Sequence, residues 1–138
     1  LANASDVGAA PHGTDPSPKA NASLAGVAHR VCCGLLPSSA EGWPLAAYVL
    51  NKVSGGIIHV HENVHEDILQ NWAHVTLCTA FEALFHTLAQ QAQSDGSTAD
   101  AAPAFRMSVK CIHLEKVKSY APRVMHIVAD LRCVPVPL

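Results

Sequence analysis

Two short apolar runs joined by a helical stretch constrain the fold of this chain more than any other feature. The first run covers residues 31–36 and is bounded by Arg30 and Pro37. Its length and composition are typical of a strand buried in a parallel sheet, and Pro37 ends it because proline cannot donate a hydrogen bond to a neighbouring strand. The second run covers residues 57–61. Together they predict two buried, parallel strands.

Helical periodicity is found between the two runs and again after them. Residues 43–52 carry apolar side chains three and four positions apart, with Pro44 in the first turn, where its missing N–H does no harm. The same periodicity predicts a longer helix over residues 66–93. Residues 94–103 have the composition of a loop.

Two further strands are predicted near the carboxyl end. Residues 107–115 are strand-like, and residues 125–133 alternate between apolar and polar side chains. One face of the second strand is therefore buried, and the other, which carries His126, is expected to be half exposed. A turn over residues 118–122 joins the two strands as an antiparallel hairpin. The order β-α-β-α-β-β predicts an α/β fold with two parallel strands, an antiparallel terminal hairpin and helices packed on the sheet.

Composition narrows the classes of function. The 138 residues are 49% hydrophobic and 14% charged, with a net charge of −2, so they can bury one core and show no overall basicity for nucleic acid. Five cysteines without a Cys-x-x-Cys pair predict reduced, mostly buried thiols and a cytoplasmic protein. No apolar run reaches the roughly 18 residues of a membrane span. Residues 1–23 are predicted to be a flexible low-complexity segment, and residues 24–138 to form the ordered domain.

The stretch His-Val-His-Glu-Asn-Val-His at residues 59–65 raises the question of a metal site. His59 and His61 lie two positions apart and share one face of a strand, and such a pair can bind zinc. The sequence offers no clear third and fourth ligand, so we predict no metal. Histidines that are packed and hydrogen-bonded within the fold are the alternative for this stretch.

Several segments together carry a family resemblance. They are Arg30-Val31, Gly34-Leu35-Leu36-Pro37-Ser38-Ser39, Glu41-Gly42-Trp43-Pro44, Gly55-Gly56-Ile57-Ile58-His59-Val60-His61-Glu62-Asn63-Val64, Val117-Lys118-Ser119-Tyr120-Ala121-Pro122 and His126-Ile127-Val128. In this order and spacing they resemble the tRNA wybutosine-synthesising aminocarboxypropyl transferases, which are related to the tRNA guanine-N1 methyltransferases of the anticodon loop. The resemblance covers roughly residues 25–134.

The resemblance implies a class I methyltransferase-like (Rossmann-like) fold, of which this chain is similar to the carboxyl-terminal half. The glycine-rich S-adenosylmethionine loop and the acidic residue that holds the ribose belong to the other half, and neither is found in this sequence. We therefore expect a partial domain over residues 24–138. Its partner would be either the missing amino-terminal half or a second chain, and we expect the chain alone to be inactive.

The resemblance also implies an activity: transfer of the 3-amino-3-carboxypropyl group of S-adenosylmethionine to the demethylwyosine base next to the anticodon of tRNA-Phe. No residue is assigned a catalytic role, since positioning carries such a reaction and no covalent nucleophile is needed. The residues expected to face substrate or cofactor are Leu36, Pro37, Ser38, Ser39, His61 and Asn63. The residues expected to contact tRNA are Lys118, Tyr120 and Arg123.

Alternatives stay open at two levels. The chain could be part of a tRNA guanine-N1 methyltransferase of the same fold, which would release S-adenosylhomocysteine in place of methylthioadenosine, or a catalytically silent RNA- or protein-binding remnant. The segment at residues 34–39 has an alternative interpretation as an ordinary turn after a strand, in which Ser39 caps the following helix.

Overall fold

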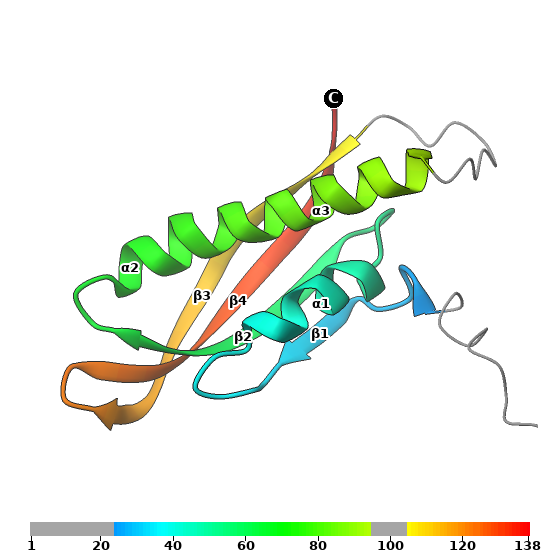
Figure 1. The fold of residues 1–138 in the computed structure, drawn as a ribbon. Helices are drawn as coiled ribbons and strands as arrows, with labels where there is room; N and C mark the ends of the chain where they lie inside the picture. The colour runs from blue at the N-terminus through cyan, green and yellow to red at the C-terminus, as the bar shows by residue number, and fades with distance from the viewer. Residues whose placement is uncertain (1–23, 95–104) are drawn as a thin grey trace, which may run out of the picture.

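A four-stranded mixed sheet carries its helices on one face (Figure 1). The computed structural model describes residues 24–94 and 105–138, so the predicted low-complexity segment and nearly all of the predicted loop at residues 94–103 lie outside the described residues. In chain order the elements are β1 (Arg30–Cys33), α1 (Trp43–Val49), β2 (Gly56–His65), α2 (Leu69–Asn71), α3 (Leu77–Ser94), β3 (Phe105–Ala121) and β4 (Val124–Pro137). No helix in this part of the chain is long and apolar enough to cross a membrane.

The sheet has the strand order β1-β2-β4-β3. The β1 and β2 strands are parallel, and β4 is antiparallel to both β2 and β3. This confirms the predicted α/β class, with its parallel pair and antiparallel terminal hairpin. The core lies between the sheet and the helices, where Ile58, Val60, Ile127 and Leu131 of the central strands are fully buried.

The first strand is shorter and more exposed than predicted. It ends at Cys33, which is its only buried residue, and Leu35 and Leu36 are 61% and 44% exposed. The physical reason is position: β1 is an edge strand of the described sheet and pairs with β2 alone. An apolar run in the sequence does not by itself indicate whether the strand will have neighbouring strands on both sides.

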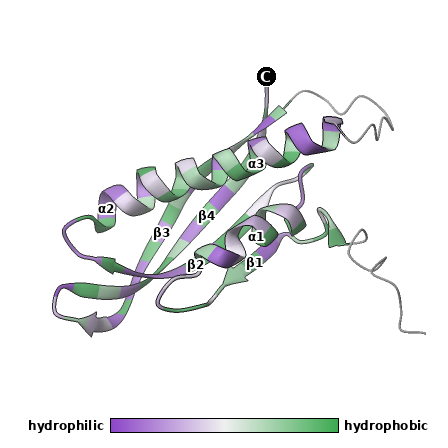
Figure 2. Ribbon diagram, viewed as in Figure 1, coloured by the Kyte–Doolittle hydropathy of each residue, from purple (hydrophilic) through white to green (hydrophobic). Residues whose placement is uncertain are grey.

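The long predicted helix is present, with a different start. Residues 66–68 form a turn in which the backbone N–H of Glu66 donates to the carbonyl of Arg123 at 2.8 Å. The helix then runs from α2 through a π-helical turn at Trp72–Thr76 into α3. Hydrophobic and hydrophilic residues alternate along α3 (Figure 2), and its buried side chains face the sheet. The start at residue 66 was therefore wrong by about one turn.

The terminal hairpin is longer than predicted, and its turn lies farther along the chain. The turn is formed by residues 122–123, where Arg123 adopts a left-handed conformation with φ of 60°. Lys118 and Tyr120 consequently lie on β3 rather than in the turn. His126, which was expected on a half-exposed face, is only 8% exposed, because His61 of β2 packs against it.

Two glycines at the entrance to β2 hold backbone against backbone. Gly55 has a φ of +71°, and a Cβ atom on it would lie 2.1 Å from the carbonyl oxygen of Cys133. A Cβ atom on Gly56 would lie 2.3 Å from the carbonyl oxygen of His29. These contacts require glycine at both positions, and they close the α1–β2 connection onto the neighbouring strands.

The five cysteines, all within the described residues, are free. Cys33, Cys78 and Cys133 are buried, Cys111 is partly buried and Cys32 is exposed. This confirms the prediction of mostly buried thiols. Burial raises the pKa of Cys133 to about 12, so this thiol stays protonated and serves as a small apolar side chain.

Candidate substrate-facing site

The segment after β1 is attached to the carboxyl half of β2. Ser38 and Glu62 form an isolated antiparallel bridge, and the backbone N–H of Asn63 donates to the carbonyl oxygen of Pro37 at 3.0 Å. The Leu36–Pro37 peptide bond is cis. The structure thus brings two stretches predicted to face the substrate, residues 36–39 and residues 61–63, into direct contact.

Glu62 links these two stretches through its side chain. Its Oε2 atom accepts hydrogen bonds from the Ser38 hydroxyl at 3.0 Å and from the backbone N–H of Ser39 at 3.3 Å. The residue is only 9% exposed. Burial raises the pKa of the Glu62 carboxyl, and the two hydrogen bonds from the serines oppose that rise.

Sequence reasoning missed Glu62, although a signal was present. Glu62 alternates with Ile58, Val60 and Val64 along β2, all of which face the core. A carboxylate on the buried face of a strand requires hydrogen-bond partners, because burial without them is costly. The serines two dozen residues earlier are those partners.

The two serines have different environments. Ser39 is 1% exposed, and its hydroxyl oxygen accepts a hydrogen bond from the indole N–H of Trp43 at 3.0 Å. Its side chain makes no capping hydrogen bond to the Ala40–Gly42 turn within the described structure, so the alternative interpretation of Ser39 as a helix cap was wrong. Ser38 is exposed, and its hydroxyl accepts from the backbone N–H of Ala40 at 3.2 Å.

His61 and Asn63 lie on the other face of β2, the face directed away from α1 and α3. His61 Nδ1 is 3.2 Å from Nε2 of His126 on β4. The amide atoms of Asn63 and Nδ1 of His126 are buried and have no hydrogen-bond partner among the described residues. Burial, followed by the charges of His61 and Lys118, lowers the pKa of His126.

The two histidines of the possible zinc pair have separate partners. His59 Nδ1 lies 2.6 Å from Asp130 Oδ1, and His59 Nε2 lies 3.3 Å from Arg30 Nη1. His61 is directed at His126 instead. Within residues 24–94 and 105–138, no three metal-ligating side chains gather around a common point.

The three candidates for tRNA contact also differ from one another. Lys118 and Tyr120 are exposed on β3, and Tyr120 is 61% exposed. Arg123 is engaged at the hairpin turn, where Nε donates to Glu66 at 3.0 Å and Nη2 bonds Asp67. Its charge therefore already has two carboxylate partners.

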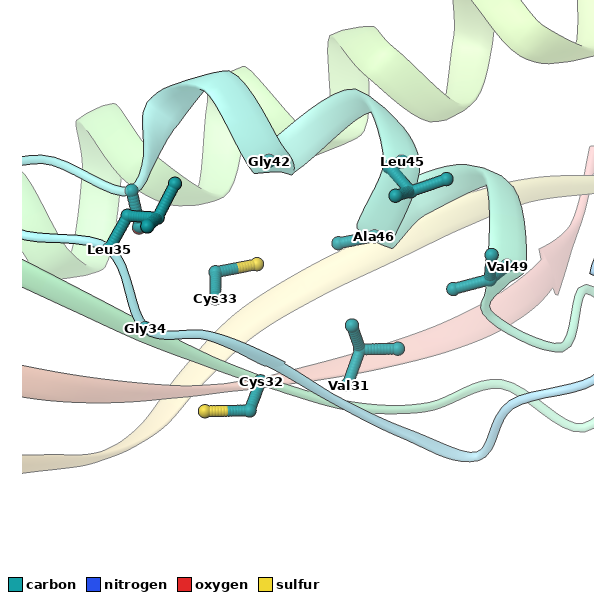
Figure 3. Close-up of a pocket in the computed structure, with 10 residues that line it drawn as sticks. Val31, Cys32, Cys33, Gly34, Leu35, Gly42, Leu45, Ala46 and Val49 are labelled. Carbon is teal, nitrogen blue, oxygen red and sulfur yellow. The ribbon is translucent and has the colours of Figure 1, made fainter.

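A cavity of about 260 Å³ lies between β1 and α1, beside the segment that follows β1. Figure 3 shows Val31 and Cys33 of β1 directed toward Ala46 and Val49 of α1, whereas Cys32 points away. Burial raises the pKa of Cys33 to about 11, which excludes a reactive thiolate at neutral pH. The lining suits an apolar group and offers little for chemistry.

Comparisons of the sequence with known proteins identify relatives. No protein-family model matches the chain. The chain is 34% identical over 147 residues to the tRNA wybutosine-synthesizing protein 2 homolog of Rattus norvegicus, covering 83% of this chain and 34% of that protein. It is 41% identical over 109 residues to the tRNA wybutosine-synthesizing protein 2/3/4 of Arabidopsis thaliana, covering 78% of this chain and 9% of that protein. The chain therefore spans about a third of the rat relative and less than a tenth of the Arabidopsis relative.

Two solved structures share the fold. A protein of Pyrococcus horikoshii is 25% identical with a TM-score of 0.51, over 81% of this chain and 34% of the other. TYW2 of P. horikoshii in complex with MeSAdo is 24% identical with a TM-score of 0.50, over 80% of this chain and 33% of the other. These similarities agree with the methyltransferase-like fold expected from the sequence.

Proposed function

Because the chain belongs to the family of tRNA wybutosine-synthesizing protein 2, we propose that it forms the carboxyl-terminal, substrate-facing part of a tRNA aminocarboxypropyl transferase. The transferred group would be the 3-amino-3-carboxypropyl arm of S-adenosylmethionine, and the acceptor the demethylwyosine base of tRNA-Phe. The observation that carries this proposal is the contact between residues 36–39 and the carboxyl half of β2, which gathers the predicted substrate-facing residues at one end of the sheet.

S-Adenosylmethionine, when bound, supplies a methylene carbon that is activated by the adjacent sulfonium. A carbon of the base forms a bond to this methylene carbon while the C–S bond breaks. Methylthioadenosine leaves, and the base loses a proton. The protein's contribution is mainly to orient the two reactants. Ser38 and Glu62 fit the arm, because an exposed hydroxyl backed by a buried carboxylate suits a group that carries positive charge. Leu36 adds an exposed apolar surface to the same segment.

For tRNA, we propose that Lys118 contacts phosphate and Tyr120 stacks on a base, which their exposure on β3 supports. Arg123 instead holds the hairpin turn to Glu66 and Asp67. We place the reaction in the cytoplasm, which the five free thiols support. We also propose that the main cofactor-binding residues lie outside this chain, since the chain spans 34% of its rat relative.

The proposal can be tested by exchange of matching regions. The region of the rat protein that matches this chain is replaced by this chain, and the chimera is incubated with S-adenosylmethionine and tRNA-Phe that carries demethylwyosine. We expect methylthioadenosine and an enlarged base, both identified by mass spectrometry. S-Adenosylhomocysteine would indicate the guanine-N1 methyltransferase instead. Calorimetry with S-adenosylmethionine serves as the folding control, and a chimera that binds it but forms neither product would overturn the proposal.

A further inference from the structure

We propose that Glu62 is a positioning residue that makes Ser38 an acceptor for a cationic group of the ligand, and that this group is the α-ammonium of the aminocarboxypropyl arm. The identity of the ligand rests on the proposed function. The role of Glu62 in ordering residues 37–40 does not, because it follows from hydrogen bonds within the chain.

The hydrogen-bonding capacity of Ser38 sets what it can bind. A serine hydroxyl has one donor and two acceptor positions. The donor is directed at Glu62 Oε2, and one acceptor position is taken by the backbone N–H of Ala40. Because Ser38 is exposed, one acceptor position is left for a ligand, and the partner must be a donor.

Glu62 acts as an acceptor in both of its contacts. The Ser38 hydroxyl and the Ser39 backbone N–H converge on the same oxygen, Oε2, and a backbone N–H can only donate. The carboxylate lies directly behind the hydroxyl, where it polarises the O–H bond and strengthens the remaining acceptor. Ser38 therefore presents a more negative oxygen than an isolated serine would.

The charge of Glu62 has no counter-ion within the protein. Glu62 takes part in no ion pair among residues 24–94 and 105–138, and it is 9% exposed. A partly desolvated carboxylate near a ligand site favours a cationic ligand over a neutral one. Between the donors available at the site, this favours the ammonium of the arm over a neutral N–H of the base.

The surrounding contacts fix where Ser38 stands. Asn63 holds the carbonyl of Pro37, Trp43 holds the hydroxyl of Ser39, and Glu62 supplies the link between them. Loss of the Glu62 carboxylate would leave the Ser39 N–H without its partner and free the Ser38 hydroxyl to rotate. The ligand would then meet a mobile hydroxyl in place of a fixed acceptor.

The positioning role is tested without any ligand, by amide hydrogen exchange of the 138-residue chain followed by NMR. We expect Glu62→Ala to speed exchange of the Ser39 N–H by about tenfold or more, whereas Glu62→Gln, which keeps an acceptor of the same shape, has a smaller effect. The matched control is Glu82→Ala, since Glu82 Oε1 accepts from the backbone N–H of Val109 at 2.9 Å on another part of the sheet. Unchanged Ser39 exchange in Glu62→Ala would overturn the positioning role.

The ligand assignment is tested on the chimera described above, which supplies the rest of the rat protein, by titration with S-adenosylmethionine and with methylthioadenosine, which lacks the aminocarboxypropyl arm. We expect Ser38→Ala and Glu62→Gln to weaken S-adenosylmethionine by about tenfold and to leave methylthioadenosine unchanged. Equal weakening of both nucleosides, or of neither, would overturn the ammonium assignment. A chimera carrying the unchanged sequence of this chain that binds neither nucleoside would refute the proposed ligand, while the exchange result on Glu62 would still stand.

Discussion

Two histidines that lie two positions apart on β2 have opposite surroundings. At His59 both ring nitrogens have partners, Asp130 on β4 and Arg30 on β1, so three strands are tied together. At His61 one imidazole faces another, and the adjacent Asn63 amide and His126 Nδ1 are buried without partners among the described residues. Two histidines on the same face of one strand therefore differ in effect: His59 links neighbouring strands, whereas polar groups near His61 have no hydrogen-bond partner.

The cluster around His59 should therefore stabilise the folded chain, whereas the cluster around His61 should destabilise it. A hydrogen bond to a charged group contributes about 1.5–3 kcal/mol, whereas a buried polar group without a partner costs about 1–3 kcal/mol. The groups without partners lie where the backbone N–H of Asn63 on β2 bonds Pro37. This part of β2 is the proposed substrate-facing end of the sheet. Buried, unsatisfied groups of this kind are more common at functional sites than in structural cores.

The largest effect is expected from breaking the satisfied cluster with Asp130→Ala. This change removes the partner of His59 Nδ1, and because both side chains are about a quarter exposed, we expect a loss of about 1.5–2 kcal/mol in the free energy of unfolding. Urea denaturation measures it. The control is Glu115→Ala, whose pair with His113 is 59–60% exposed, with an expected loss below about 0.5 kcal/mol. Similar losses in both variants would show that the His59 cluster does not tie the strands.

A gain of about 1 kcal/mol is expected when Asn63, in the unsatisfied cluster, is replaced by leucine, a side chain of similar size. The amide atoms of Asn63 have no partner to lose, so Asn63→Leu removes only their desolvation cost. Asn51→Ala is the matched control, because Asn51 Oδ1 accepts from the backbone N–H groups of Val53 and Ser54, and its loss should destabilise the chain. Thermal unfolding compares the stability of the two variants. Destabilisation by Asn63→Leu would contradict the conclusion that the polar groups around His61 destabilise the fold.

A smaller, pH-dependent effect is expected from His126. Its folded-state pKa is lowered by burial, then by His61 and Lys118, so the unfolded chain binds more protons than the folded chain below the ordinary histidine pKa of about 6.5. Stability should therefore fall as the pH drops below about 6.5 and level off once the folded-state pKa is passed. His126→Phe should flatten this part of the profile. A profile that His126→Phe leaves unchanged would assign the titration to another group.

The smallest effect is expected from Arg30→Gln, at the exposed end of the satisfied cluster. The Arg30 contact to His59 Nε2 is long, at 3.3 Å, and lies at the surface, so the expected loss is at most about 0.5 kcal/mol by thermal unfolding. A loss as large as that of Asp130→Ala would show that Arg30, rather than Asp130, holds the cluster together.

The fold was largely predictable because each element has its own local pattern. Spacings of three and four residues predicted both helices, and the alternation over residues 125–133 correctly placed Ile127 and Leu131 in the core. The end of β1 was not predictable, because exposure of Leu35 depends on the absence of a further neighbouring strand in the described sheet, which composition does not encode.

The candidate site was predictable only in part, since its central contacts join residues that are distant in sequence. The resemblance pointed to Ser38 and to Asn63, but the link through Glu62 depends on the course of the chain after β1. His126 was missed for the same reason, because the β2–β4 register places it opposite Asn63, 63 positions earlier, and next to His61. The role of Arg123 depends in turn on where the hairpin folds back onto residues 66–67.

The glycine pair before β2 has a consequence for the interpretation of mutational scans. A side chain at Gly55 would collide with the backbone of Cys133, and one at Gly56 with the backbone of His29. Both positions should therefore reject every substitution, whether or not the selection requires catalytic activity. Adjacent intolerant glycines suggest a nucleotide-binding loop to anyone who has only the scan. Here the intolerance would report on the closeness of two main chains, and a selection for folding alone would reproduce it in full.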